Sequence, residues 1–237
     1  MRKLGVVLFA SCSFDANVAV ESIDAATGDA QVDAPTDPPP LPPCNVGVTT
    51  MPGTDRGRVG GNGGGANFPP LRCTNTTDRI VGIGLRMSDG NTLYNARSAH
   101  ALLIACAPVT IDPNTGTGMT GTVYTVEVSG SGAEGWSPST LTPITTCPAG
   151  TILDGLQTHT GPNTNLFNNV NFRCTRFDGT TALAIGSQVV HAAGSLTESQ
   201  GVDTVNCGAN EIVYEMSNLT GSGFDSVNLF CAPARCL

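Results

Sequence analysis

Three stretches of this 237-residue chain begin and end with cysteine and follow one internal pattern. In the second stretch, CPAGTILDGLQTHTGPNTNLFNNVNFRC at 147–174, an apolar pair follows the first cysteine. A polar loop rich in Gly, Asn and Thr comes next, and an alternating apolar run leads into the last cysteine. Residues 207–231 repeat the pattern closely and residues 73–106 more loosely, and their apolar pairs align as Ile80-Val81, Ile152-Leu153 and Ile212-Val213. Such alternation predicts half-buried strands.

A strand-like stretch also precedes the first cysteine of each unit. Val123, Thr125 and Glu127, for example, alternate as a strand with one buried face would. Each unit is therefore expected to contain about four short strands. A single small sheet cannot bury its apolar face alone, so three sheets are expected to pack around a common axis. The low aromatic content of 5%, with 29 Gly and 16 Pro, suits short strands and turns.

The N-terminus has the layout of an export signal. In MRKLGVVLFASC two basic residues precede a short apolar run and a small residue, which predicts a signal peptide over residues 1–11. The same residues resemble the lipobox of bacterial lipoproteins, which implies lipidation of Cys12; the alternative is an ordinary signal peptide cleaved nearby. Residues 12–43 are acidic and end in PPPLPP, so they are expected to form a disordered tether. We expect a cell-surface location, as a bacterial outer-membrane lipoprotein.

The repeat in residues 44–237 resembles the vitelline membrane outer layer proteins. CPAG at 147–150 and LFNNVNFRC at 166–174 match the motifs of that family best, and GAEGWSP at 132–138 is similar to its Gly/Trp segment. The resemblance covers residues 45–235 in outline. It implies an all-β domain with a β-prism fold, in which three Greek-key sheets surround a pseudo-threefold axis. Function is not implied by that fold alone.

The nine cysteines fit this arrangement. Without Cys12 there are eight, and exported domains favour disulfides, so a disulfide-braced domain is expected. One pair is predicted for each repeat, with each pair bracketing the outer strands of its own sheet. A β-prism brings its termini together, which makes the two terminal cysteines the fourth pair. The predicted pairs are Cys73–Cys106, Cys147–Cys174, Cys207–Cys231 and Cys44–Cys236.

Several function classes are disfavoured by composition and motifs. The net charge is −8, and residues 44–237 are mildly acidic with scattered arginines, which does not suit nucleic acid. No CxxC spacing occurs and there are three His, so neither a zinc site nor a cofactor is predicted. The acids are dispersed and no catalytic constellation is recognised, so the chain is not expected to be an enzyme. A secreted hydrolase or glycosyl-transferring enzyme is the alternative.

Sugar binding needs planar hydrogen-bonding groups and an aromatic platform. The loop HTGPNTNLFNN at 159–169 is the richest in such groups, and Asn163, Asn165 and His159 are its candidate ligand residues. Trp136 and Tyr94 are candidate platforms, although Trp136 also suits a core and Asn-rich loops are common turns. We expect a non-catalytic surface module that binds extracellular glycans or builds matrix, with a lipid anchor as its only membrane contact.

Overall fold

A computed structural model describes residues 40, 42–48, 53–60, 66–67, 69–87, 99–112, 114–129, 140–141, 143–160, 167–177, 182–190, 201–220 and 224–237. The chain divides into two units, residues 1–39 and residues 40–237. The first unit lies outside the described residues, and with it the predicted signal peptide, Cys12 and most of the predicted tether.

The described part of the second unit forms three antiparallel sheets. The first sheet contains β4 (Arg79–Met87), β5 (Ala99–Ala107), β8 (Tyr124–Ser129), β9 (Thr140–Leu141) and β10 (Thr145–Thr146). The second contains β11 (Thr151–Thr160), β12 (Phe167–Phe177), β13 (Ala182–Val190) and β14 (Gly201–Asn206). The third contains β15 (Glu211–Thr220), β16 (Phe224–Cys236), β2 (Thr54–Gly60) and β3 (Ala66–Asn67), extended by β1 (Cys44–Val48), β6 (Val109–Ile111) and β7 (Gly118–Thr120). No helix, and hence no membrane-spanning helix, occurs among these described residues.

The sheets share one Greek-key order around a central hairpin. In the second sheet the order is β13-β12-β11-β14, so β14 returns to lie beside the strand that began the unit. In the first sheet β9 and β10 return beside β4 in the same way. The first strands of the three hairpins, β4, β11 and β15, each contact the other two. The predicted all-β, three-sheet β-prism is therefore confirmed.

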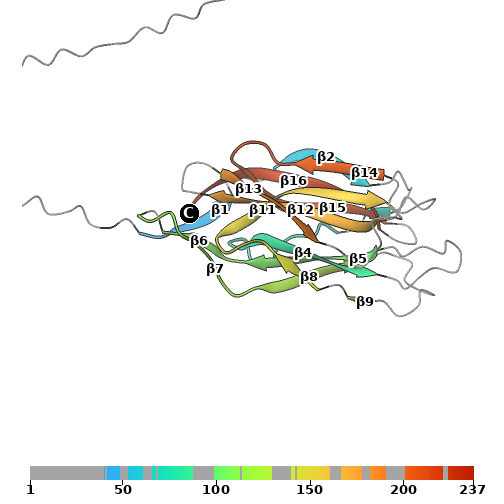
Figure 1. Ribbon diagram of the computed structural model, residues 1–237, viewed down its shortest axis with the longest axis horizontal. Coiled ribbons are helices and arrows are strands. Elements are labelled where there is room, and N and C mark those ends of the chain that lie inside the picture. Colours follow the sequence, from blue (N-terminus) through green and yellow to red (C-terminus); the bar gives the residue numbers. More distant parts are fainter. Residues whose placement is uncertain are drawn as a thin grey trace, which may run out of the picture. The chain divides into compact units, whose positions relative to one another are not determined.

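The membership of each sheet differs from the sequence-based expectation. Strands that precede a first cysteine were expected to join the hairpin that follows them, but they join the hairpin before them. Strand β8 pairs with β5, and β13 pairs with β12. The hairpin of β15 and β16 is completed by β2 and β3 from the N-terminal side: β2 pairs with β16 and β3 pairs with β15. Figure 1 shows the C-terminus beside β1, at one end of the domain.

The four disulfides are the pairs predicted from the repeat, but the three repeat disulfides join neighbouring sheets and do not bracket single ones. Cys147 follows β10 of the first sheet and bonds to Cys174 in β12 of the second. Cys207 follows β14 of the second sheet and bonds to Cys231 in β16 of the third. The remaining bonds are Cys73–Cys106 and Cys44–Cys236. Each of the three repeat disulfides thus fastens one sheet to the next.

Two apolar clusters fill the domain. The larger cluster lines the inner faces of the three hairpins, where side chains such as Ile83, Leu156, Phe172 and Leu229 are almost fully buried. The second cluster lies where β1 and β6 cover the beginnings of the hairpins, and it includes Val46, Val81, Ile111, Ile152 and Ile212.

Candidate functional sites

Each central hairpin contains a β-bulge at the same place, and the bulge residue differs in each copy. The bulges place one unpaired residue in the first strand of each hairpin, just after the residue opposite the closing cysteine: Val81, Asp154 and Tyr214. In two copies the carbonyl of this residue accepts a hydrogen bond from the amide of the next sheet's first cysteine, Cys147 at 2.6 Å and Cys207 at 2.8 Å. The bulges therefore tie each sheet to the turn that begins the next one.

At Val81, the first bulge residue, the surrounding strands leave no room for a ligand. Val81 is fully buried in the second apolar cluster, beneath β1 and β6. The turn after Cys147 also lies directly against β7, because Gly150 contacts Gly118 and a Cβ on either residue would collide with the backbone of the other. Gly150 has φ = 73°, a conformation that glycine adopts without strain. No side chain separates these two backbones, so nothing can enter here.

The position of Asp154 opens into a small hollow of about 300 Å³, which the turn after Cys207 also lines. Asp154 is buried, and the Nε of Arg173 donates to both of its carboxylate oxygens at 2.9 and 3.0 Å. Glu211 lines the same hollow, and Arg56 forms an ion pair with it. Both carboxylates of this hollow are thus held by arginines.

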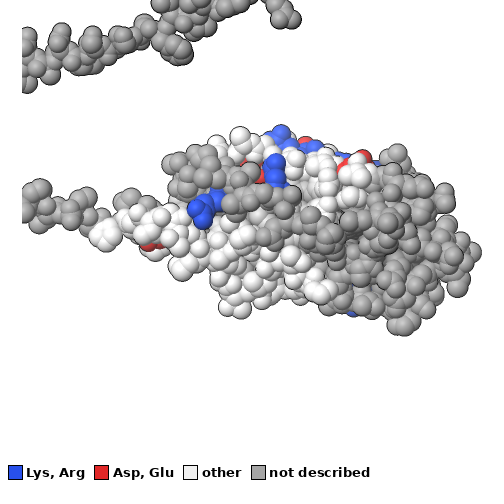
Figure 2. Space-filling model, viewed as in Figure 1, with Lys and Arg blue, Asp and Glu red and all other residues white. Residues whose placement is uncertain are grey.

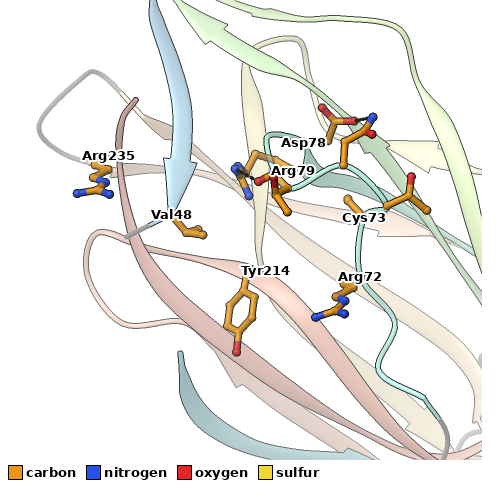
Figure 3. Close-up of a pocket in the computed structure, with 10 residues that line it drawn as sticks. Val48, Arg72, Cys73, Asp78, Arg79, Tyr214 and Arg235 are labelled. Atoms are coloured by element: carbon orange, nitrogen blue, oxygen red, sulfur yellow. Dashed lines mark hydrogen bonds between the residues drawn. The ribbon is translucent and has the colours of Figure 1, made fainter. Parts of the chain in front are cut away.

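The position of Tyr214 opens into a cavity of about 480 Å³. We call this cavity the arginine pocket. Figure 3 shows Arg72, Arg79 and Arg235 around it, with the Tyr214 ring beside Arg72 and below Val48. The lining residues are Val48, Arg72, Cys73, Thr74, Asn75, Thr76, Asp78, Arg79, Tyr214 and Arg235. They come from β1, β4, β15, β16 and the segment 72–78 that precedes β4, so strands from two sheets meet here.

Arg79 breaks the repeat. The register places Ile80, Leu153 and Val213 opposite the three closing cysteines, so Arg79 is equivalent to Ile152 and Ile212, and the sequence alignment of the apolar pairs was wrong by one residue. The turn after Cys73 is one residue longer than the others, which explains the error. Ile152 is fully buried and Arg79 is 4% exposed. A charged side chain therefore occupies a core position in one copy of three.

The buried Arg79 guanidinium bonds to backbone oxygens. Its Nε donates to the carbonyl of Val46 at 2.9 Å, and its Nη2 donates to the carbonyl of Thr76 at 2.8 Å. Burial lowers the pKa of Arg79 from its ordinary value, and the charge of Asp78 offsets part of that shift. Because arginine stays protonated in proteins, a positive charge is fixed at the inner side of the pocket.

Arg72 and Arg235 lie at the rim. The Arg72 side chain is 61% exposed, and its closest acidic partner is Glu215 at 4.0 Å. Burial raises the pKa of the Glu215 carboxyl, and Arg72 opposes that shift. Arg235 is exposed and forms no ion pair with any residue that the structure describes. Basic side chains in the view of Figure 2 lie mainly over the half of the domain with β1, β2 and β16.

A second polar feature lies on the outer face of the second sheet. Gln157 donates from Nε2 to the hydroxyl of Thr204 at 3.2 Å, and Asn171 donates from Nδ2 to Gln157 Oε1 at 2.7 Å. The same Asn171 nitrogen lies 3.2 Å from His159 Nε2. We call Thr204, Gln157, Asn171 and His159 the amide row. A depression of about 230 Å³ beside it is lined by Gly155, Arg173 and Asn206 together with residues of the row.

Unsatisfied polar atoms gather at the His159 end of the row. Four buried side-chain nitrogen or oxygen atoms lack a hydrogen-bond partner among the described residues, and two of these belong to the row, His159 Nδ1 and Asn171 Oδ1. A third, Thr158 Oγ1, lies on the buried inner face of β11. Burial lowers the pKa of His159 below its ordinary value, so the neutral imidazole is favoured. A neutral ring whose Nε2 accepts from Asn171 carries its proton on Nδ1.

Of the site residues predicted from the sequence, one is described by the structure and the others are not. Asn163, Asn165, Trp136 and Tyr94 lie outside the described residues. His159 is described and belongs to the amide row. Sequence reasoning missed its neighbours Gln157 and Asn171, although the alternation in LQTHT and VNFRC places their side chains on one outer face. It also missed the arginine pocket. No group of three His, Cys, Asp or Glu residues that could hold a metal occurs in the described ranges.

Comparisons with known proteins give structural similarity alone. No protein-family model and no curated protein matches the chain. The crystal structure of Calystegia sepium agglutinin is similar at 14% identity, over 80% of this chain and 100% of that one, with a TM-score of 0.48. Calsepa lectin in complex with a biantennary N-glycan gives 15% identity, 78% and 99% coverage and a TM-score of 0.46. Malaysian banana lectin gives 13% identity, 77% and 99% coverage and 0.44. The β-prism assignment rests on strand pairing and hairpin contacts, not on these similarities.

Proposed function

We propose that the domain is a non-catalytic module that binds glycans at the cell surface through the outer face of its second sheet. The observation that carries the proposal is the amide row. Its four side chains combine hydroxyl, amide and imidazole groups, which can both donate hydrogen bonds to sugar hydroxyls and accept bonds from them. They project from paired strands and already bond to one another, so little conformational entropy is lost when a ligand binds.

The loop after His159 extends this surface in our proposal. Asn163 and Asn165 follow the row along the chain and would supply further amide groups to the same sugar. Leaving a buried polar group unpaired costs about 1–3 kcal/mol. A polar ligand that reached the His159 end of the row would relieve part of that cost. Affinity at one shallow site would be weak, so many anchored copies would bind a polymer by avidity.

A glycan array with the purified chain, followed by binding to the polysaccharide found, tests this function. Gln157→Ala should weaken binding at least tenfold. Asn228→Ala is the matched control, because Asn228 occupies in the third sheet the position of Asn171 and is also paired across the hairpin. Equal loss in the two variants, or unchanged binding in Gln157→Ala with an intact fold, would refute the role of the row.

We also propose the cellular location that the N-terminal sequence indicates. Residues 1–11 would direct export, Cys12 would carry the lipid, and residues 12–43 would hold the domain away from the outer membrane of a bacterium. Labelled palmitate should enter the wild-type chain, while Cys12→Ser should be unlabelled and released into the medium. Equal labelling of the two chains would contradict lipidation at Cys12.

The alternative function is a secreted hydrolase, and the hollow at Asp154 is the place to look for it. Asp154 and Glu211 both line this hollow, and glycoside hydrolysis needs two carboxylates. Each already bonds to an arginine, which argues against a free acid or base. The purified chain should release no reducing ends from polysaccharide. Release that Glu211→Gln abolished would establish the enzyme in place of the binding module.

A further inference from the structure

We propose that the arginine pocket binds a sugar ring that carries an oxyanion, either a carboxylate or a sulfate ester. The sugar part of this inference rests on the proposed glycan-binding function, while the anion part rests on the pocket alone. Nothing in the amide row supplies a comparable charge, because Thr204, Gln157, Asn171 and neutral His159 carry none. The pocket would therefore select acidic polymers among those that the domain meets.

The charge balance of the pocket is the first argument. Residues 44–237 contain nine Arg and thirteen Asp or Glu, so the domain as a whole is acidic. Three of those nine arginines line this one cavity, with Asp78 as the one acid in its lining. The Asp78 carboxylate accepts hydrogen bonds from Asn75 Nδ2 at 2.9 Å and from Thr77 Oγ1 at 3.4 Å. It forms no ion pair with an arginine in the described part of the chain, so the cavity keeps an excess of positive charge.

The geometry of the arginines is the second argument. Arg79 is held at the inner side by two carbonyls, so its charge stays in place without a bound carboxylate. Arg72 lies beside the Tyr214 ring, whereas Arg235 lies beyond Val48 at the far side of the cavity (Figure 3), and both side chains are exposed at the rim. Guanidinium groups match the oxygens of carboxylates, sulfates and phosphates in paired hydrogen bonds. Arg79 thus places a cation at the position where the other two repeats have the buried isoleucines Ile152 and Ile212.

Tyr214 is the reason to expect that the anionic group belongs to a sugar ring. Its hydroxyl accepts a hydrogen bond from the Gly53 amide at 3.1 Å, which fixes the side chain. The aromatic face then forms one wall of the cavity (Figure 3), and such a face packs against the apolar C–H side of a sugar. The volume of about 480 Å³ lies in the range of small-molecule sites, and it exceeds the space that one inorganic anion needs.

Calorimetric titration of the full-length chain tests the proposal with four probes. They are an oligogalacturonate, its methyl ester, a sulfated galactose oligomer and inorganic sulfate. The oligogalacturonate or the sulfated oligomer should bind, and whichever binds identifies the anion. The methyl ester keeps the ring and removes the charge, so it should bind at least tenfold more weakly than the free acid. Inorganic sulfate should bind at least tenfold more weakly than the sugar that binds.

Three exposed positions supply the variants. Arg72→Ala and Arg235→Ala should each weaken binding of the acidic oligomer at least tenfold, since both side chains are exposed and the fold does not depend on them. Arg176→Ala is the matched control, because Arg176 is an exposed arginine of β12 outside the pocket lining and should have no effect. Equal weakening by Arg176→Ala would show non-specific charge attraction and overturn the site.

The outcomes separate this site from the proposed function. If neither acidic oligomer binds, or if the methyl ester binds as well as the acid, the arginine pocket is not an anion site. If inorganic sulfate binds as tightly as the sugars, the ring has no role. If Gln157→Ala weakens glycan binding while Arg235→Ala does not, the amide row is supported and the pocket is refuted. The reverse result supports the pocket and refutes the row.

Discussion

Arg79 in the first hairpin and Ile152 in the second occupy equivalent positions, and both side chains are buried. In the first hairpin, Arg79 donates hydrogen bonds to the carbonyls of Val46 and Thr76. Arg79→Met would keep the apolar stem and remove both donors. We expect a loss of about 2–4 kcal/mol in the free energy of unfolding, since the bond to the carbonyl of the buried Val46 and the bond to the carbonyl of Thr76 would both be lost.

Urea unfolding followed by circular dichroism, with the disulfides intact, measures this change. Arg235→Met is the control, because that arginine is exposed and its replacement should stay within about 0.5 kcal/mol. An Arg79→Met chain as stable as the wild type would show that the guanidinium has no structural role.

The contact between Gly150 and Gly118 can be isolated by comparing two glycines. Gly150 and Gly116 both have positive φ, 73° and 68°, so alanine strains the backbone similarly at each. A Cβ on Gly116 meets nothing within 4 Å, whereas a Cβ on Gly150 meets the backbone of Gly118. We expect Gly116→Ala to cost about 1–2 kcal/mol and Gly150→Ala about 1–3 kcal/mol more. Equal thermal shifts in calorimetry would mean that β7 does not pack on this turn.

The disulfides should differ in what they contribute to stability. In the chain-entropy model, a cross-link that closes a longer loop restricts the unfolded chain more. Cys44–Cys236 spans 192 residues and Cys207–Cys231 spans 24, which correspond to about 5 and about 3.5 kcal/mol. Replacing both cysteines of each pair by Ser and comparing urea midpoints checks the order. A greater loss for the short loop would indicate that native contacts dominate over chain entropy.

The repeat and the disulfide pairs were readable from the sequence, because cysteine positions and apolar alternation are local signals. The membership of the sheets was not. A strand such as β8 has the same alternation whether it pairs with the hairpin before it or the one after it, and only the packed structure decides. The alignment error at Arg79 also has a physical cause. The turn after Cys73 has one additional residue, and this shifts an alignment that is based on apolar pairs alone.

The candidate sites were predicted in part for the same reason. His159 was found because it lies in a stretch rich in polar residues. The arginine pocket was missed because Arg72 and Arg235 are far apart in the chain and come to line one cavity only when the strands pack together. Asn171 and Gln157 are in two strands of one hairpin, and their pairing depends on a bulge at Asp154 that changes the register.

The lowered pKa of His159 gives a pH dependence with a definite sign. The unfolded chain takes up a proton on this ring near its ordinary pKa of about 6.5, whereas the folded chain takes it up only at lower pH. The contribution of His159 to stability is therefore fully present above about pH 6.5. It is lost as the pH falls from there toward the pKa that His159 has in the folded chain. Replacement of His159 by Gln should remove this part of the pH dependence of the unfolding free energy.

Unfolding free energies of wild type and His159→Gln, measured from pH 8 to pH 5, provide the test. The difference between the two chains cancels the titration of the carboxylates that both contain. Relative to its value at pH 8, the stability of the wild type should fall further toward acidic pH than the stability of His159→Gln. Parallel curves across this range would show that His159 titrates alike in the folded and unfolded chains.

The pairing of β2 with β16 sets an order on the formation of the domain. A chain that emerges from its N-terminus can complete the first sheet once residue 146 is free, and the second once residue 206 is free. Strand β2 emerges early but must remain without its partner until residues 224–236 arrive. Closure therefore waits for β16, and a chain cut short before β16 would expose β2 as an open edge that can pair with another molecule.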